Sequence, residues 1–254
     1  MTVRLKVVEM DVLSKEFYDA CASELKDRVS EKRYTHVMGV SQTAEDLANR
    51  YGIDPDKARL AGLLHDWDKD LDDDAIRDRM VELGLQDKID PWVVANMPRV
   101  LHGPTAAAAL SSMFPELPQD VIDAIYKHTT ASTDMSDLDK VIYIADAIEP
   151  SRRFGAVDEL RADVDSLTLD ELYLRIYKFW IMALIEHDVV LYPDTLDIWN
   201  DLAMKVKRGD IVSDWQRSKE ERAAKSKKKD KKSKKHKDEK KPKKGKKAKK
   251  SKKN

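Results

Sequence analysis

Apolar residues recur every three or four positions along most of this chain, and that spacing limits the fold more than any other feature. Val37, Val40, Ala44 and Leu47 share one face of a helix, and Gly52 follows where a C-terminal cap belongs. No run alternates apolar and polar residues between hairpin turns, and no internal repeat is visible. The sequence therefore predicts an all-α fold.

Capping residues give the ends of further helices. Asp54-Pro55 is typical of a helix start, with a capping carboxylate followed by proline in the first turn. The charged segment Asp72–Leu83, which precedes Gly84, is predicted to be a surface helix. The other helices are predicted at Pro104–Met113, Gln119–His128, Leu138–Ile148, Leu169–Ile185 and Asp194–Lys207.

Charge divides the chain into two parts of opposite sign. The whole chain carries 47 basic and 47 acidic residues, but Gln216–Asn254 holds 22 basic against 5 acidic ones, which leaves 25 basic and 42 acidic residues elsewhere. A lysine-rich segment with almost no apolar side chains cannot offset its ordering entropy. We expect an N-terminal helical extension at 1–30, one folded domain at 31–207, and a disordered polybasic tail at 216–254.

Composition and the first residues favour a soluble, cytoplasmic protein. The single cysteine, Cys21, excludes an internal disulfide framework and fits a reducing compartment. The N-terminal segment lacks a secretory pattern, and the longest apolar run, Phe179–Ile185, is far short of the roughly 20 residues of a membrane span. We expect no membrane association.

Several polar residues fall on faces or at ends of helices that should point inward. They are His36, His65, Asp66, His128 and Asp146. Each has an ordinary interpretation: a hydrogen-bonded core histidine, a helix cap, or, for Asp146, an ion pair with an arginine. A single metal cluster would explain all of them at once, because imidazole and carboxylate are common metal ligands and an unpartnered buried charge is costly. His187, near a predicted helix end, is left to a surface or capping role.

The order of these residues resembles that of a known enzyme superfamily. The segments RYTHVMGV, AGLLHDWDK, VLHGPTAA, AIYKHTT, IYIADAIEPSRRF and LYPDTLDIWN contain His36, His65-Asp66, His102, His128 and Asp146 in turn. They resemble the YqeK-type branch of the HD-domain phosphohydrolases, the symmetrical bis(5′-nucleosyl)-tetraphosphatases, over about residues 33–200. Trp67-Asp68 departs from the branch's more apolar pair, and the tail lies outside the pattern.

The resemblance implies a single HD-domain helical bundle over residues 31–207. It also implies roles for individual residues. Metal ligands would be His36, His65, Asp66 and Asp146, and catalytic residues Asp66, Lys69, His102 and His128. Substrate phosphates would contact Arg33, Lys69, His102, His128, Thr129 and Arg152, with Tyr192, Thr195 and Asn200 near the nucleotide. Alternatively, the basic side chains of Arg33, Lys69 and Arg152 form ordinary surface ion pairs.

The metal that the resemblance implies is iron, although such ligands suit manganese or zinc nearly as well. His102 and His128 are also of a residue type that binds metal and could hold a second ion. The sequence does not decide between one ion and two. The implied reaction is hydrolysis of diadenosine tetraphosphate to two ADP, by attack of a metal-bound hydroxide on a central phosphate.

Two other hypotheses stay open at this point. An HD-domain phosphohydrolase or nucleotidase acting on another nucleotide would use the same site. A polyanion-binding protein would instead use the tail to contact nucleic acid or ribosomes, since such a charge binds polyanions with little sequence preference. The tail could equally be a solvated segment without a partner. The sequence leaves the oligomeric state undetermined.

Overall fold

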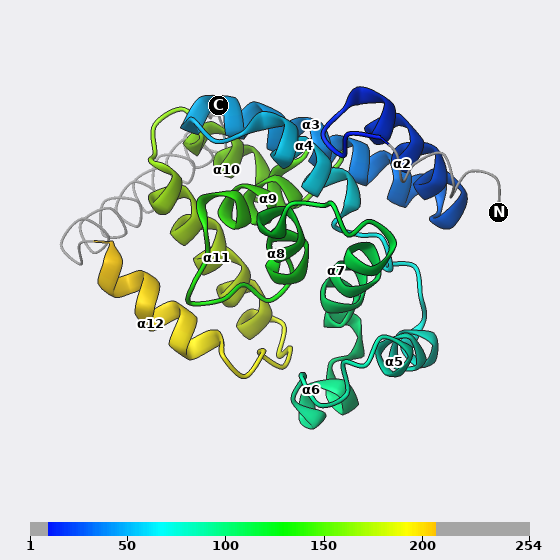
Figure 1. Ribbon diagram of the computed structural model, residues 1–254. Coiled ribbons are helices and arrows are strands. Elements are labelled where there is room, and N and C mark those ends of the chain that lie inside the picture. Colours follow the sequence, from blue (N-terminus) through cyan, green and yellow to red (C-terminus); the bar gives the residue numbers. More distant parts are fainter. Residues whose placement is uncertain (1–9, 207–254) are drawn as a thin grey trace, which may run out of the picture. The chain divides into compact units, whose positions relative to one another are not determined.

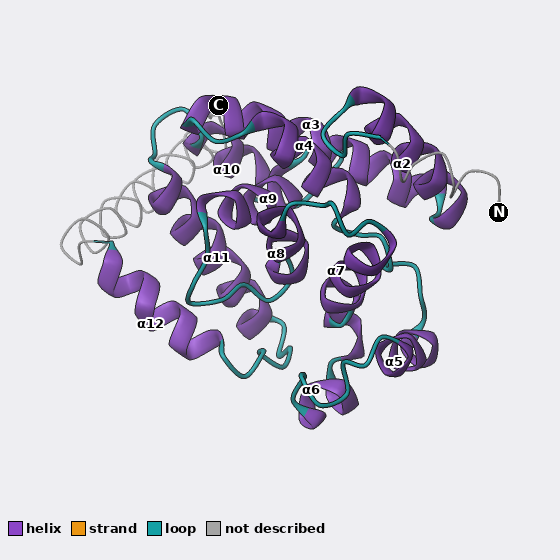
Figure 2. Ribbon diagram, in the orientation of Figure 1, coloured by secondary structure: helices purple, strands orange, loops and turns teal. Residues whose placement is uncertain are grey.

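The structure is a computed structural model in which residues 10–206 are described. Throughout that range the regular structure is helical, with no strand, as Figures 1 and 2 show, so the all-α prediction is confirmed. The elements are α2 (Lys15–Arg28), α3 (Glu31–Tyr51), α4 (Pro55–Leu64), α5 (Asp73–Glu82), α6 (Pro91–Asn96), the 3-10 turn η1 (Pro98–Val100), α7 (His102–Met113), α8 (Gln119–Lys127), α9 (Asp137–Ile148), α10 (Val157–Asp163), α11 (Leu169–Glu186) and α12 (Thr195–Lys205). The predicted tail at 216–254 lies outside the described residues.

The predicted capping residues lie at the ends of the helices, as expected. The Asp54 carboxylate accepts from the amides of Asp56 and Lys57 at the start of α4, and Asp72 does the same for α5. Gly52 ends α3 in the left-handed conformation, with φ 74°. Helix α7 begins two residues earlier than predicted, at His102, and the short α6 and α10 were not predicted because they contain too few turns to show a period.

The helices that matter for the site pack around α8 and α9. Figure 1 shows these two in the middle, with α3 and α4 above them and α7 beside α8; the contacts between α3 and α4, α3 and α9, α4 and α8, and α7 and α8 agree with this arrangement. Below α7, α5 and α6 enclose a small core of their own, made by Ile76, Met80, Leu85, Val93 and Leu101. None of the helices between residues 10 and 206 is long and apolar enough to cross a membrane.

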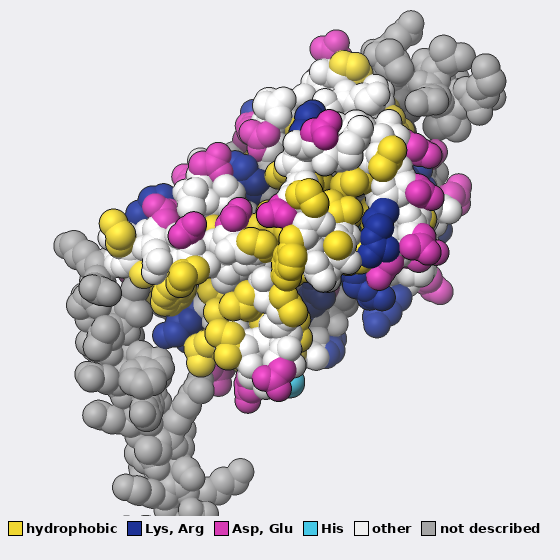
Figure 3. All heavy atoms as spheres, turned by 90° about the horizontal axis from the view of Figure 1, so that it is seen from below, with side chains coloured by type: hydrophobic (Ala, Val, Ile, Leu, Met, Phe, Trp, Pro, Cys, Tyr) yellow, Lys and Arg dark blue, Asp and Glu magenta, His cyan; other side chains and the backbone are white. Residues whose placement is uncertain are grey.

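The surface of the described part mixes charged and apolar side chains. On the face shown in Figure 3, apolar side chains gather between groups of acidic and basic ones. The large apolar side chains that are exposed include Met182 and Ile185 near the end of α11 and Val189 and Val190 just after it. The core combines aliphatic side chains with a few large aromatic ones such as Trp67, Tyr173 and Phe17, and Val37 and Val40 are fully buried on α3 as the sequence predicted.

Two glycines allow helix pairs to approach closely. A Cβ added at Gly62 of α4 would lie 2.8 Å from the Ser41 Cα of α3, and one added at Gly103 of α7 would lie 2.9 Å from the backbone oxygen of Tyr126 in α8. Backbone atoms cannot yield as a flexible side chain can. The absence of a side chain at each glycine therefore allows the short distance between the two helices. The histidines singled out in the sequence lie in these helices or directly after them.

We expect Gly62→Ala to destabilise the fold by about 1–3 kcal/mol, because the added methyl would separate α3 from α4. Urea unfolding followed by circular dichroism measures the loss. Gly155→Ala is the matched control, since a Cβ there meets nothing within 4 Å. Equal stabilities for the two variants would contradict a close α3–α4 contact at Gly62.

Candidate metal centre

Six of the predicted site residues are brought together from five segments of the fold. His36 lies in the second turn of α3, His65 and Asp66 directly follow α4, His102 begins α7, His128 ends α8, and Asp146 lies in the last turn of α9. All except the half-buried Asp146 are buried. The expectation that these polar groups point inward is confirmed.

Asp66 lies at the centre of the group. Its Oδ2 is 3.6 Å from His36 Nε2 and 3.4 Å from His65 Nε2. Its Oδ1 is 3.2 Å from His102 Nε2 and 3.6 Å from His128 Nε2. One carboxylate thus lies between two pairs of imidazoles, with one oxygen directed at each pair.

Asp146 completes the first pair. Its Oδ1 lies 3.0 Å from His36 Nε2 and 4.0 Å from His65 Nε2. Burial works to raise the pKa of Asp146, but the Arg152 guanidinium that pairs with it opposes burial, and the pKa lies below its usual range. Asp66 is likewise paired, with Arg33 Nη1 2.7 Å from its Oδ2. Both groups are carboxylates at neutral pH.

The other ring nitrogen of each imidazole is held by an acceptor. Three of the rings donate Nδ1–H to the carbonyl three residues earlier, and the fourth donates to a carboxylate. The pairs are His65 with Gly62, His102 with Arg99 and His128 with Ile125, each at 2.7 Å, and His36 with Glu149 at 2.9 Å. Because a carbonyl only accepts, Nδ1 carries the hydrogen, and in a neutral ring Nε2 keeps its lone pair.

These lone pairs face one another and the carboxylates. His102 Nε2 lies 2.9 Å from His128 Nε2, and burial, together with the nearby His128 and Lys69, lowers the pKa of His102 to about 4 despite Asp66. His102 is therefore neutral at pH 7. Its one ring hydrogen is on Nδ1, so its Nε2 has no hydrogen to donate to His128. The buried Nε2 atoms of His36 and His65 have no hydrogen-bond partner. Such a set of donors fits a cation.

The donors form two groups of ligand size. His36, His65 and Asp66 make one, and Asp66, His102 and His128 make the other; in each, the ligand atoms lie within 4.8 Å of one another. Since Asp66 belongs to both groups, the arrangement can hold two ions that share this carboxylate. The mixture of nitrogen and oxygen donors suits iron, manganese and zinc alike.

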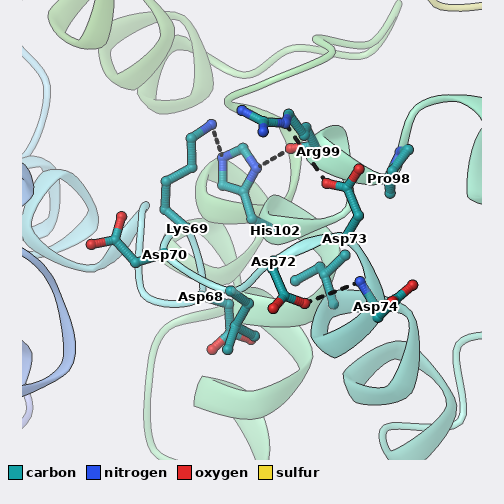
Figure 4. Close-up of a pocket in the computed structure, with 11 residues that line it drawn as sticks. Asp68, Lys69, Asp70, Asp72, Asp73, Asp74, Pro98, Arg99 and His102 are labelled. Atoms are coloured by element: carbon teal, nitrogen blue, oxygen red, sulfur yellow. Dashed lines mark hydrogen bonds and ion pairs between the residues drawn. The ribbon is translucent and has the colours of Figure 1, made fainter.

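The predicted phosphate-binding residues surround this cluster. The Nζ of Lys69 lies 3.3 Å from His102 Nε2, and Figure 4 shows its side chain extended toward that ring. Burial lowers the pKa of Lys69, although Asp66 and Asp146 act to raise it. The Thr129 hydroxyl lies 3.1 Å from His102 Nε2 and 3.0 Å from His128 Nε2.

The two arginines pair with the carboxylates of the cluster rather than with surface groups alone. Arg33 Nη1 donates to Asp66 Oδ2 at 2.7 Å. Arg152 pairs with the Asp146 carboxylate and donates from Nε to its backbone oxygen at 2.7 Å. Both guanidinium groups thus contact candidate metal ligands, and about a third or less of each arginine side chain is exposed.

A cavity of about 570 Å³ opens beside Lys69 and His102 (Figure 4). Its wall is largely acidic, with Asp70, Asp72, Asp73 and Asp74 on one side and Pro98 and Arg99 on the other. The Asp72 carboxylate caps α5, and Asp73 lies 3.7 Å from Arg99. Access to the cluster from this side passes a negatively charged rim.

The Trp67-Asp68 pair, which departs from the family pattern, is buried. Asp68 Oδ1 lies 3.3 Å from Arg28 of α2 and Oδ2 lies 3.5 Å from Arg79 of α5. The Arg28 guanidinium lies over the Trp67 ring at 4.6 Å. The polar residue thus fastens the turn that carries Asp66 and Lys69 to two neighbouring helices.

Three residues expected near the nucleotide have other contacts. Tyr192 packs on the small α5–α6 core, the Thr195 carbonyl accepts from the Tyr177 hydroxyl at 3.4 Å, and Asn200 is exposed on α12. None of the contacts described for residues 10–206 joins them to the histidines. His187 is exposed and ends α11, as expected.

Sequence reasoning missed Glu149, whose carboxylate holds His36. Its signal was available: it follows Asp146 by three residues, which places both on the same side of a helix.

Comparison with known proteins points to one family. The HD domain model matches residues 33–151. The chain is 33% identical over 178 residues to a symmetrical bis(5′-nucleosyl)-tetraphosphatase of Bacillus subtilis, covering 69% of this chain and 92% of that one. It is 35% identical over 184 residues to the protein of that name in Halalkalibacterium halodurans, covering 72% and 95%.

A solved structure agrees in fold. The crystal structure of a predicted HD superfamily hydrolase involved in NAD metabolism, from Clostridium acetobutylicum, matches with a TM-score of 0.68 and 36% identity. It covers 74% of this chain and 97% of that one. The likeness therefore extends to sequence as well as fold.

We expect Asp66→Ala to abolish metal binding, because it removes the group shared by both ligand sets, and His65→Ala to weaken it strongly. Elemental analysis of the purified protein measures bound metal, and circular dichroism checks that the helices persist. His187→Ala should retain the wild-type metal content. Full metal content in folded Asp66→Ala would refute this ligand assignment.

Proposed function

Because this chain belongs to the HD-domain symmetrical bis(5′-nucleosyl)-tetraphosphatases, we propose that it hydrolyses diadenosine tetraphosphate to two molecules of ADP. The observation that carries the proposal is the cluster in which Asp66 joins two pairs of imidazoles, with Lys69 beside it. Its relatives are named for hydrolysis of dinucleoside tetraphosphates. The chemistry of the cluster fits that reaction.

The reaction adds water to one of the two central phosphorus atoms and breaks the anhydride bond between them. The leaving diphosphate takes up a proton, and two nucleoside diphosphates result. A bound divalent metal supplies a nucleophilic hydroxide at neutral pH and positive charge for the phosphoryl oxygens. The protein must hold that metal, orient the phosphates and balance their negative charge.

For the metal we propose two sets of ligands. His36, His65, Asp66 and Asp146 would hold the first ion, and His102 and His128, together with Asp66, would hold a second ion or contact the substrate phosphates. Iron is the proposed metal, with manganese and zinc as alternatives that the same donors accept. The convergence of Nε2 atoms on carboxylates, with those of His36 and His65 buried and without a hydrogen-bond partner, supports this assignment.

For the substrate we propose contacts with basic and hydroxyl groups at the cluster. Lys69 would neutralise a phosphate oxygen as a point charge, and its partial burial would strengthen that interaction by excluding some of the water. Arg33 and Arg152 would bind further phosphate oxygens from their positions beside Asp66 and Asp146. The Thr129 hydroxyl would donate to phosphate next to His102 and His128.

We expect metal-loaded protein to convert diadenosine tetraphosphate into ADP alone, because attack falls between the central phosphates. Anion-exchange chromatography separates ADP from AMP and ATP. An Asp66→Ala sample prepared in the same way should give no product. Formation of AMP and ATP, or rapid hydrolysis of another nucleotide with none of this one, would contradict the proposal.

We further propose that residues 31–207 form the catalytic domain, that 1–30 form a helical extension, and that 216–254 form a tail without catalytic function. Phe17 and Leu25 of α2 are buried, which supports an extension that packs on the body of the protein. We also propose a cytoplasmic location, because a chain with a single cysteine fits a reducing compartment.

A second function is supported by the excess of 17 positive charges between Gln216 and Asn254. We infer that this segment holds the enzyme on a polyanion such as nucleic acid. Deletion of 216–254 should leave hydrolysis unchanged and abolish retention on a nucleic-acid column in low salt. Retention that survives the deletion, or that persists unchanged at high salt, would contradict the inference.

A further inference from the structure

We propose that Glu149 is a positioning residue that sets metal affinity at the first site by holding His36. The inference rests on the proposed function only in that it takes the cluster to bind metal. Glu149 Oε1 lies 2.9 Å from His36 Nδ1 and 3.9 Å from the Nε of Arg152, the partner of Asp146. The shorter contact is a hydrogen bond, so the His36 ring is its main route to the site. Nothing in the family resemblance assigns it a role.

The carboxylate of Glu149 is fully buried and fixed at both oxygens. Oε1 accepts from His36 Nδ1 at 2.9 Å and from the Ser151 hydroxyl, and Oε2 accepts from the Ser151 amide at 2.6 Å. The guanidinium of Arg161 donates to the Glu149 backbone oxygen at 2.6 Å and to that of Ile148 at 2.8 Å. Side chain and backbone are therefore both held in place.

Helix α3 leaves space for this carboxylate. Gly39 lies three residues after His36, and a Cβ at Gly39 would lie 2.6 Å from Glu149 Oε2. Any side chain here would push the carboxylate away or move the end of α9. Two separate features therefore support the contact between Glu149 and His36: the glycine at position 39 of α3, and the hydrogen bonds that hold the Glu149 carboxylate after α9.

His36 differs in this respect from the other three imidazoles. Those rings donate Nδ1–H to neutral backbone carbonyls, whereas His36 donates to a charged group. A carboxylate draws the Nδ1 proton more strongly and makes Nε2 a better electron donor to a metal. It also fixes the ring orientation in which Nε2 faces Asp146 and Asp66.

The consequence is a difference between the two ligand sets. The first has two carboxylates, Asp66 and Asp146, and a charged partner behind His36. The second shares Asp66 but has the Lys69 ammonium 3.3 Å from His102 Nε2. We therefore expect the first site to bind a cation more tightly than the second, and Glu149 to contribute to that difference.

The test is Glu149→Gln, which keeps the size of the side chain and removes its charge. Binding of Mn²⁺ to metal-free protein is followed by electron paramagnetic resonance, without substrate. We expect the dissociation constant of the tighter phase to rise about 10- to 100-fold. The weaker phase should shift less, because its imidazoles do not touch Glu149.

Asp139→Asn is the matched control. Asp139 lies on α9, is as fully buried as Glu149, and pairs with Lys127 at 3.1 Å. Its substitution should lower the melting temperature without changing Mn²⁺ affinity. If both variants weaken the tighter phase equally, Glu149 acts only through stability, and the proposal is overturned.

An unchanged tighter phase in Glu149→Gln would also overturn it. Should that variant fail to fold, Gly39→Ala is measured instead, since it displaces the same carboxylate and should weaken the same phase. The outcomes are separable from the proposed function. Wild-type protein that binds Mn²⁺ but does not hydrolyse the tetraphosphate refutes only the activity, whereas active enzyme with normal Mn²⁺ binding in Glu149→Gln refutes only this inference.

Discussion

The convergence of four imidazole Nε2 atoms on the two oxygens of Asp66 is the interaction on which the rest of the structure depends. Lone pairs and a carboxylate buried together repel one another unless positive charge lies among them. The helices that contribute them, α3, α4, α7 and α8, pack closely enough to enforce the convergence. Packing and cation binding are therefore linked, since whatever stabilises one favours the other.

The hydrogen bonds that orient the rings also serve the fold. The last carbonyls of a helix have no partner within it. His65 and His128 follow α4 and α8 directly, and their Nδ1 groups donate to the carbonyls of Gly62 and Ile125 in the final turns. The same bond thus caps a helix and directs Nε2 at Asp66. This double use explains why histidines stand at helix ends here.

Helical periodicity predicted which side chains are buried, and it did so well where helices are long and capped. It placed His65 and His128 inward because each continues an apolar face. It could not show which buried groups meet, because that depends on contacts between helices far apart in the chain, such as α3 with α9. The pairing of Glu149 with His36 could not be predicted for this reason, since the two residues are 113 positions apart.

The acidic character of the protein makes the basic residues of the site more informative. Without its last 39 residues the chain holds 42 acidic against 25 basic groups, and the cavity rim carries four aspartates, so a polyphosphate meets repulsion on approach. Salt screens exposed charges over about 8 Å, but it acts much less on buried ones. Lys69 is half-buried beside His102, so its charge is screened less than the charges of the exposed rim. Attraction at short range with repulsion at the surface favours a ligand that reaches the metal centre over anions that only touch the rim.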